Sequence, residues 1–394
     1  MANTLKFGDG KWATGEGTAL AFNDENDNFK PLPFTFTRAS KATVVNQSGL
    51  IEEVGNDVPR IDFKDNTKGA LLLEPQRTNL ITYSEDFSTW TTFRSSVTAN
   101  DIVSPDGSQN AEKIIQQSGQ TSSGGVYQNL TLSNSTVYTY SVFLKSGGYD
   151  FGVIRIDGGQ YAWFDLSSGA IGSITGSGSS SIEDFGNGWY RCSFTITTTS
   201  TTGQPHIYIA NSDGSQALSG ADGVKGIYAW GAQLEAGSYP TSYISTSGSA
   251  VTRLRDKCLK DDFSILTVGN SYTLFFDVDL NEGDVNITFF NIENSSGATS
   301  LTVRSYPNNS IRVYNNLNSQ YPVSSLASST NKWVVRIDGT SFKIFGAEGS
   351  LIGTLTTARD MGEGIFGRYS QTKINDFKVY NTALSDSESE ALVN

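Results

Sequence analysis

Histidine and cysteine are nearly absent from this sequence. Its 394 residues include one histidine, His206, and two cysteines, Cys192 and Cys258. Two cysteines cannot supply a Cys₄ zinc site, and a single histidine cannot complete a Cys₂His₂ site. A Ser–His–Asp triad would depend on His206 alone, and no nucleophile motif lies near it in the sequence. The composition therefore argues against a structural zinc protein and against a serine hydrolase.

Long apolar runs and basic runs are also missing. The longest apolar run, residues 70–73, is far too short to cross a bilayer. The N-terminus lacks a positive region followed by an apolar core, so we expect no secretory signal. The formal net charge is −12, whereas nucleic-acid binding normally needs a basic patch. We therefore expect neither membrane insertion nor a nucleic-acid partner, and no disulfide between the two cysteines, which we place in separate domains.

Glycine and aromatic residues are abundant. The chain contains 40 glycines, 22 phenylalanines and 17 tyrosines, while charged residues make up only 17%. Glycine and asparagine suit tight turns, and aromatic residues suit the pleated faces of strands. A chain of this length can form two or three domains with separate cores. We predict an all-β protein in which an extended N-terminal segment precedes two β-sandwich domains.

We expect residues 1–77 to form the N-terminal segment. Their apolar residues show no sustained period before an alternating strand signal at residues 34–37. A segment that buries so little must gain its order from a partner, either other copies of the chain or a larger assembly. We therefore predict attachment and oligomerisation through this segment, and we expect a chain without residues 1–60 to stay soluble. Six aromatic residues are the attachment candidates: Phe7, Trp12, Phe22, Phe29, Phe34 and Phe36.

Residues 78–257 and residues 258–394 are expected to form one β-sandwich each. Both contain short strands with strict alternation, which is typical of sandwiches. In the second, one strand face is predicted to carry Tyr272, Leu274, Phe276, Val278 and Leu280, and the other Thr273, Phe275, Asp277 and Asp279. Residues 332–345 indicate a hairpin with Asp338 and Gly339 in its turn. Ser385 and Glu388 form a capping box, which predicts a short terminal helix.

Four stretches resemble parts of tailed-bacteriophage virion proteins. Residues 69–90 are similar to a junction that joins an N-terminal attachment segment to a carbohydrate-binding-like β-domain, and residues 36–43 and 59–62 resemble the attachment side of that pattern. Residues 228–244 resemble the end of the same domain. Residues 374–394 are similar to the last strand and turn of concanavalin A-like, laminin-G-type lectin sandwiches. The resemblance covers nearly the whole chain in three pieces.

This resemblance implies a structural protein on the virion surface. It implies a non-enzymatic head fibre or capsid-decorating appendage whose N-terminus docks to phage capsid or tail proteins. Jelly-roll or lectin-like domains would then project outward and contact host or environmental glycans. Appendages of this kind imply homo-oligomers, and a trimer is expected here. A tail fibre or receptor-binding protein is the alternative that differs mainly in where the N-terminus docks.

Four aromatic residues are candidates for glycan binding. Sugars stack their C–H faces on exposed aromatic rings, while their hydroxyl groups need polar partners. Tyr161 and Trp163, and separately Trp189 and Tyr190, offer such rings near predicted turns. The first two also alternate as core residues would, so a packing role stays open for them.

Two aspartates give a different alternative, a capsular polysaccharide depolymerase. Asp277 and Asp279 are two apart on one strand, and this spacing would place their carboxylates about 6.5–7 Å apart on one face. Inverting glycosidases use a similar separation. Solvated acids on the outer face of a strand are the plainer interpretation. No cofactor or metal is expected, although a structural calcium ion bound by oxygen ligands such as Asp222 and Asp284 stays possible.

Overall fold

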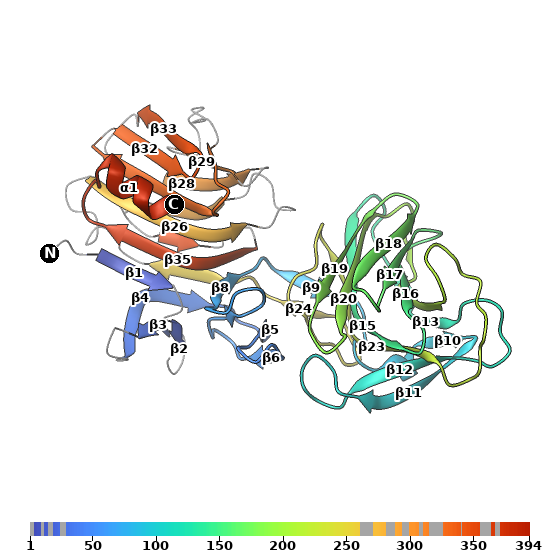
Figure 1. The fold of residues 1–394 in the computed structure, drawn as a ribbon. Helices are drawn as coiled ribbons and strands as arrows, with labels where there is room; N and C mark the ends of the chain where they lie inside the picture. Colours follow the sequence, from blue (N-terminus) through green and yellow to red (C-terminus); the bar gives the residue numbers. More distant parts are fainter. Residues whose placement is uncertain are drawn as a thin grey trace. The chain divides into compact units, whose positions relative to one another are not determined.

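The computed structural model describes residues 4–8, 12–14, 19–23, 29–260, 271–280, 288–293, 299–306, 310–314, 326–339, 341–354, 364–366 and 371–394. These residues form two compact units. Unit 1 combines residues 1–47, 53–76 and 254–394, and unit 2 combines residues 48–52 and 77–253. Both are built almost entirely of β-strands, so the predicted all-β class is confirmed (Figure 1). Within the described residues no helix is both long enough and apolar enough to span a membrane.

Unit 2 is a sandwich of two six-stranded antiparallel sheets. One sheet has the order β10 (Thr91–Phe93), β13 (Gly125–Tyr127), β22 (His206–Ala210), β16 (Phe151–Arg155), β17 (Tyr161–Asp165) and β18 (Ala170–Thr175). The other has the order β11 (Ser95–Ile102), β12 (Ala111–Gln116), β23 (Gly226–Ala236), β15 (Val137–Gly147), β20 (Tyr190–Thr197) and β19 (Ser179–Asp184). Alternate residues of both sheets, among them Tyr140, Ile154, Phe194 and Ile207, meet in one buried core.

Shorter elements complete unit 2. They are the 3₁₀ helix η1 (Phe87–Thr89), the pair β14 (Leu130–Thr131) and β21 (Thr202–Gly203), and the pair β9 (Arg77–Asn79) and β24 (Val251–Arg253). The last pair joins the strand by which the chain enters unit 2 to the strand by which it leaves.

Unit 1 is a second sandwich. Its first sheet has the order β33 (Gly349–Thr354), β32 (Ser341–Gly346), β31 (Lys332–Asp338), β26 (Ser271–Leu280), β35 (Thr372–Tyr380), β8 (Ala70–Leu73) and β7 (Ile61–Asp62), and β1 (Thr4–Gly8) also pairs with β35. Its second sheet has the order β2 (Trp12–Thr14), β3 (Ala19–Asn23), β4 (Phe29–Thr37), β25 (Lys257–Lys260), β34 (Gly364–Phe366), β27 (Thr288–Glu293), β28 (Thr299–Tyr306), β29 (Ser310–Tyr314) and β30 (Leu326–Ala327). The hairpin β5 (Ala42–Val45) and β6 (Ile51–Val54) is separate.

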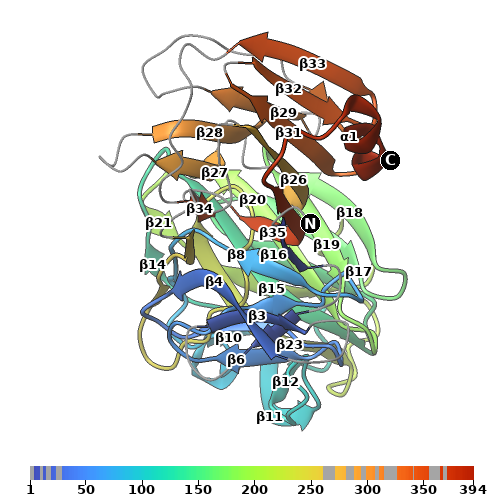
Figure 2. The same ribbon diagram turned by 90° about the vertical axis from the view of Figure 1, so that its left-hand side faces the viewer.

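The predicted alternation in β26 is found in the structure. Tyr272, Leu274, Phe276 and Val278 all lie in the core between the two sheets of unit 1, whereas Phe275 belongs to a cluster on the other face. The predicted hairpin is formed by β31 and β32, with Asp338 opposite Ser341. The predicted terminal helix is α1 (Asp386–Val393), which packs beside β31 and β32 (Figure 2). Its capping box between Ser385 and Glu388 is present.

The N-terminal segment is part of unit 1, which differs from the three consecutive parts expected from the sequence. Strand β1 pairs with β35 from Thr4 opposite Tyr380 to Gly8 opposite Asp376, and β8 pairs with the neighbouring part of β35. Strand β4 pairs with β25. The local sequence does not reveal these three pairings, because β1, β4 and β8 each find a partner more than 200 residues away. Residues 1–77 therefore gain contacts from the C-terminal part of their own chain.

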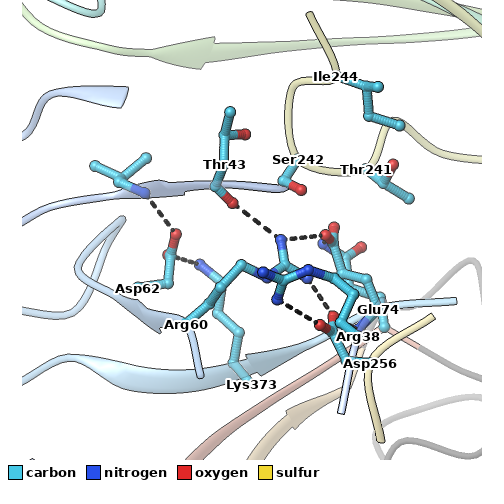
Figure 3. A network of polar contacts seen from close by, with 12 residues as sticks. Arg38, Thr43, Arg60, Asp62, Glu74, Thr241, Ser242, Ile244, Asp256 and Lys373 are labelled. Atoms are coloured by element: carbon cyan, nitrogen blue, oxygen red, sulfur yellow. Dashed lines mark hydrogen bonds and ion pairs between the residues drawn. The ribbon is translucent and has the colours of Figure 1, made fainter. Parts of the chain in front are cut away.

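Two arginines are buried in unit 1 and share one aspartate (Figure 3). Arg38 donates from Nη1 to Asp256 at 3.0 Å. Its Nη2 donates to the Gly55 carbonyl at 2.6 Å. Arg60 bonds the other carboxylate oxygen of Asp256 and donates from Nη1 to Glu74 at 2.8 Å. All four charged side chains are fully buried.

Charge is balanced within this buried network. Burial alone would lower the pKa of the Arg60 guanidinium, but the adjacent charges of Asp256 and Glu74 raise it above its ordinary value. Arg60 therefore stays charged, and its counterions are held in fixed positions by hydrogen bonds. Arg38, Arg60 and Glu74 lie in residues 36–43, 59–62 and 69–90, the stretches that resemble phage virion proteins. In this chain these motif residues hold unit 1 together.

The motif residues of unit 2 have a comparable structural role. Buried Asn79 donates to the carbonyls of Ala232 at 3.0 Å and Ile244 at 2.8 Å, and it accepts from the amide of Leu234 at 3.0 Å. Glu235 accepts from the amide of Thr241 at 2.7 Å. These bonds fix the turn that follows β23, so residues 228–244 form a folded strap.

Candidate functional site

One face of the β10–β18 sheet in unit 2 carries aromatic residues outside the core. In β22, Ile207 and Ile209 point into the sandwich core, while His206 and Tyr208 lie on the opposite face. In β17, Ala162 belongs to the core and Tyr161 to the opposite face. The same alternation places further residues there. We call the following set the aromatic face: Phe93, Tyr127, Arg155, Tyr161, His206 and Tyr208.

Four rings of the aromatic face form a continuous row. The His206 ring is stacked on Tyr127, with centroids 4.6 Å apart, and on Tyr208, with centroids 4.9 Å apart. Phe93 meets Tyr208 edge-on at 5.2 Å. Because strand register sets Tyr127 opposite His206, this row is fixed by backbone pairing.

Arg155 adds hydrogen-bond donors between the rings. It lies opposite both His206 and Tyr161 in the sheet. Its Nη1 donates to the Tyr208 hydroxyl at 3.2 Å, and its Nη2 donates to Gln204 Oε1 at 2.7 Å. Its guanidinium carbon lies 5.8 Å from the centre of the Tyr161 ring. The polar group of the face is therefore held in a fixed position.

His206 is neutral at physiological pH in this environment. Burial is the main cause that lowers its pKa to about 4, and the positive charge of Arg155 lowers the pKa further. The hydrogen bond with the Gln204 carbonyl raises the pKa but is outweighed. The Nδ1 atom lies 2.6 Å from the Gln204 carbonyl, which can only accept, so the proton is on Nδ1. For Tyr161, burial favours a higher pKa, but hydrogen bonds with Arg155 and Gln216 outweigh it and lower the pKa.

The rings differ in how much they are exposed. His206 and Tyr208 are each 6% exposed, whereas Phe93, Tyr127 and Tyr161 are half-buried. A ligand would thus meet the three half-buried rings and the half-buried Arg155 side chain first. Apolar and aromatic side chains with a few oriented polar groups are the usual lining of small-molecule binding sites.

The predicted glycan residues are not all at this place. Tyr161 belongs to the aromatic face, and Trp163 lies beside it with ring centroids 5.7 Å apart. Trp163 is only 3% exposed, and its Nε1 donates to the Ser215 carbonyl at 3.4 Å, so it is a packing residue. Trp189 is also buried, and Tyr190 begins β20 in the other sheet. The structure therefore separates the two predicted pairs.

Sequence reasoning missed Phe93, Tyr127, Arg155 and Tyr208 as members of this face. A signal for Tyr208 was present, because residues 206–210 alternate strictly. Nothing local indicates that β13, β22, β16 and β17 are neighbours in the sheet.

The predicted attachment residues lie on strands of unit 1. Phe34 and Phe36 are buried in its core, at 4% and 0% exposure. Neither side chain is exposed to a docking partner. Their burial also means that removing residues 1–60 would open the core, contrary to the expected soluble truncation. Phe7, Trp12, Phe22 and Phe29 lie on β1 to β4, but their side chains are outside the described part of the structure.

Asp277 and Asp279 lie on one face of β26 and share an amide. Asn375 Nδ2 donates to Asp277 at 3.1 Å and to Asp279 at 3.2 Å. The two accepting oxygens cannot be further apart than the sum of these distances, which is less than the ~6.5 Å lower limit for inverting pairs. Burial, together with the charges of Asp279 and Asp376, raises the pKa of Asp277. The two carboxylates are therefore both bound to one amide and are not free.

The calcium candidates are not brought together. Asp222 Oδ1 accepts from the amides of Val224 and Lys225, each at 2.9 Å, so it closes a turn. Asp284 lies outside the described residues. Over the ranges that the structure describes, no group of three or more His, Cys, Asp or Glu residues is arranged to hold a metal ion.

No protein-family model matches the sequence, and no curated protein matches it either. Several solved structures resemble the fold. A Trypanosoma rangeli sialidase in complex with the inhibitor DANA has a TM-score of 0.28 at 11% identity, covering 97% of this chain and 83% of the sialidase. Domains LG4-5 of the mouse laminin alpha1 chain have a TM-score of 0.20 at 8% identity, covering 75% of this chain and 90% of theirs. A tail fiber protein, gp63.1, from an E. coli phage has a TM-score of 0.20 at 9% identity, covering 80% of this chain and 41% of its own.

These likenesses correct one prediction. The sialidases are enzymes, so the expectation of a non-enzymatic protein is contradicted and is withdrawn. At such low identities and TM-scores the likenesses concern the fold alone, and they assign no activity to this chain.

Proposed function

We propose that this chain is a surface appendage of a tailed-bacteriophage particle, on the head, and that its aromatic face contacts carbohydrate. The aromatic face is the observation that carries the carbohydrate part. The resemblance of residues 69–90 and 228–244 to phage virion proteins supports the location.

The aromatic face suits a sugar for physical reasons. Phe93, Tyr127 and Tyr161 offer half-buried rings against which the C–H face of a sugar ring can pack. Arg155 places hydrogen-bond donors beside the rings of Tyr161 and Tyr208. Because neighbouring strands fix these groups, little side-chain entropy is lost when a ligand binds.

In this proposal, unit 1 attaches the protein to the particle. Since Phe34 and Phe36 pack in its core, attachment uses other parts of the segment spanning residues 1–77. Three copies joined around an axis would pair or cover the free edges of their sheets, which is the usual gain from symmetric assembly of β-proteins.

The carbohydrate claim is tested with the full-length chain on an array of bacterial surface polysaccharides. We expect Tyr161→Ala and Tyr127→Ala each to reduce binding at least about tenfold, since each removes an aromatic ring on which a sugar would pack and a tenfold change corresponds to about 1.4 kcal/mol. Tyr228→Ala is the matched control, a half-buried tyrosine on the other sheet of unit 2. Equal losses in all three variants, or no loss in any, would refute the assignment.

The location claim is tested by electron cryo-microscopy of particles that carry a label at the C-terminus of the chain. Label density on the head is expected. Density confined to the tail would replace the head fibre with the tail-fibre alternative. Purified protein should have three times the chain mass in analytical ultracentrifugation, and a monomer would contradict the trimer.

A further inference from the structure

A polar pocket lies on the outer face of β26 and β35 in unit 1, beside α1. Its volume is about 450 Å³, within the ~300–1,000 Å³ typical of small-molecule sites. Its lining includes three lysines, Lys68, Lys332 and Lys378, and two aspartates, Asp277 and Asp376. The lining therefore has an excess of positive charge in a chain whose formal net charge is −12.

Lys332 is the lysine that the fold leaves available. Its Cα is paired in register with Asp277 across β26 and β31. Lys378, by contrast, is 2.5 Å from Asp376 and lies 4.7 Å from the centre of the Phe275 ring. Counting only described residues, the Lys332 ammonium makes no hydrogen bond and no ion pair within 4.0 Å, and its charge acts on the nearby Asp277 carboxylate. An anion entering the pocket can pair with Lys332 without displacing a hydrogen-bonded partner.

The neighbouring part of the wall consists of hydrogen-bonding groups in fixed positions. Asn66 Nδ2 donates to Asn375 Oδ1 at 2.7 Å, and Asn375 Nδ2 in turn donates to Asp277 at 3.1 Å. Among the described residues, the Asp277 carboxylate accepts a hydrogen bond only from Asn375 Nδ2. The other lone pairs of this carboxylate can therefore accept hydrogen bonds from hydroxyl groups. Phe275 and Leu392 add apolar surface to the same lining.

We propose that this pocket binds an acidic sugar unit of the hexuronic acid type. The sugar carboxylate pairs with Lys332, the hydroxyl groups donate to Asp277, and the C–H face contacts Leu392. A neutral hexose would leave Lys332 without a counterion, and a phosphate dianion would bring one negative charge more than the Lys332 ammonium can neutralise. The site is on a different unit from the aromatic face and does not depend on carbohydrate binding there.

The test uses the full-length protein and two probes, methyl β-D-glucuronide and methyl β-D-glucoside, which differ only in the group at C6. Saturation-transfer NMR and calorimetry at low ionic strength should show binding of the glucuronide at least about tenfold tighter, as expected for one charge-assisted hydrogen bond. Lys332→Gln should remove that preference. Ala391→Trp, at an exposed pocket-lining position, should block both probes by filling the space.

Two controls separate this proposal from the proposed function. Lys41→Gln removes an exposed lysine of unit 1 and should change nothing. Tyr161→Ala should leave glucuronide binding intact, so that a failure at the aromatic face and a failure at the pocket can be told apart. Equal binding of the two probes, absence of binding, or a Lys332→Gln variant that behaves as wild type would overturn the proposal.

Discussion

Glu74 and Asp256, 182 positions apart in the sequence, are joined by one hydrogen bond between backbone groups and one from a backbone amide to a carboxylate. The amide of Glu74 donates to the Asp256 carboxylate at 2.8 Å, and the amide of Asp256 donates to the Glu74 carbonyl at 3.0 Å. Residues 77–253 of unit 2 lie between them in the sequence. The residues that flank the long segment 77–253 therefore lie side by side within unit 1.

Asp256→Ala should destabilise unit 1 strongly. The substitution removes the shared counterion of Arg38 and Arg60, both of which are fully buried. Breaking a buried ion pair from one side typically costs about 3–5 kcal/mol. Calorimetry should show the transition of unit 1 at a lower temperature and that of unit 2 unchanged. Glu53→Gln breaks the exposed pair with Lys41 and should cost less than about 1 kcal/mol. Similar costs for both variants would show that the buried network is not what stabilises unit 1.

Asn79→Ala should destabilise unit 2. The Asn79 side chain is fully buried, and its loss leaves the Ala232 and Ile244 carbonyls and the Leu234 amide without this partner. Each such group costs about 1–3 kcal/mol, so a loss of at least about 3 kcal/mol is expected in chemical denaturation. Thr78→Ala, next to it, removes only an exposed hydroxyl contact and serves as the control. A loss below about 1 kcal/mol for Asn79→Ala would show that the hydrogen bonds of Asn79 do not hold residues 228–244 in place.

Gly8→Ala should loosen the N-terminal strand from β35. Gly8 has φ +105°, and a Cβ atom there would lie close against the backbone carbonyl of Asn375, well inside contact distance. Amides of residues 376–380 should then exchange hydrogen faster than in the wild type. Gly49→Ala is the matched control, with φ +78° and nothing within 4 Å of the added atom. Unchanged exchange in Gly8→Ala would mean that β1 does not depend on this close approach.

Glu112 should make unit 2 less stable as the pH rises. Burial, with the charge of Asp86, raises the pKa of Glu112 from 4.5 to about 7. The folded state then keeps a proton that the unfolded state has already lost. This contribution to the free energy of unfolding is fully present below about pH 4.5 and is lost as the pH rises through about 7. Its size is at most about 3 kcal/mol.

The variant Glu112→Gln isolates this effect. It is neutral at every pH, and its oxygen can still accept from the amides of Phe87 and Ser88. Its melting temperature minus that of the wild type should therefore increase between pH 4.5 and pH 7.5. The lowered pKa of His206 makes the protein less stable at low pH, which is the opposite effect. Because His206 is present in both proteins, its contribution cancels in the difference between their melting temperatures. A constant difference would show that Glu112 does not hold the proton.

The sequence predicts what has a local period. The alternation of Leu274 with Phe275 fixes the two faces of β26, and Ser385 with Glu388 starts α1, because the interactions involved span only a few residues. Strand pairing across the chain has no such signal. The five residues of β1 do not reveal that they pair with β35, so the N-terminal segment looked too weak to fold within the chain.

Buried charges and shared faces were missed for the same reason. Nothing near Arg38 or Arg60 in the sequence indicates that they are buried, because their shared counterion Asp256 comes beside them only in the folded chain. Tyr161 could be proposed from its turn, whereas Arg155 and Tyr208 join it only through the order of strands in the sheet. Asp277 and Asp279 were placed on the correct face, but the amide of Asn375 that ties them together comes from β35.

The pairing of β9 with β24 has a consequence for how such a protein can change. The strands at the two ends of residues 77–253 pair with each other, and the flanking residues Glu74 and Asp256 are hydrogen-bonded within unit 1. We therefore expect residues 77–253, which make up unit 2 apart from residues 48–52, to be exchangeable as one segment. A different sandwich, or a short linker, could be spliced between residues 76 and 254 while both chain ends stay in the unit that remains.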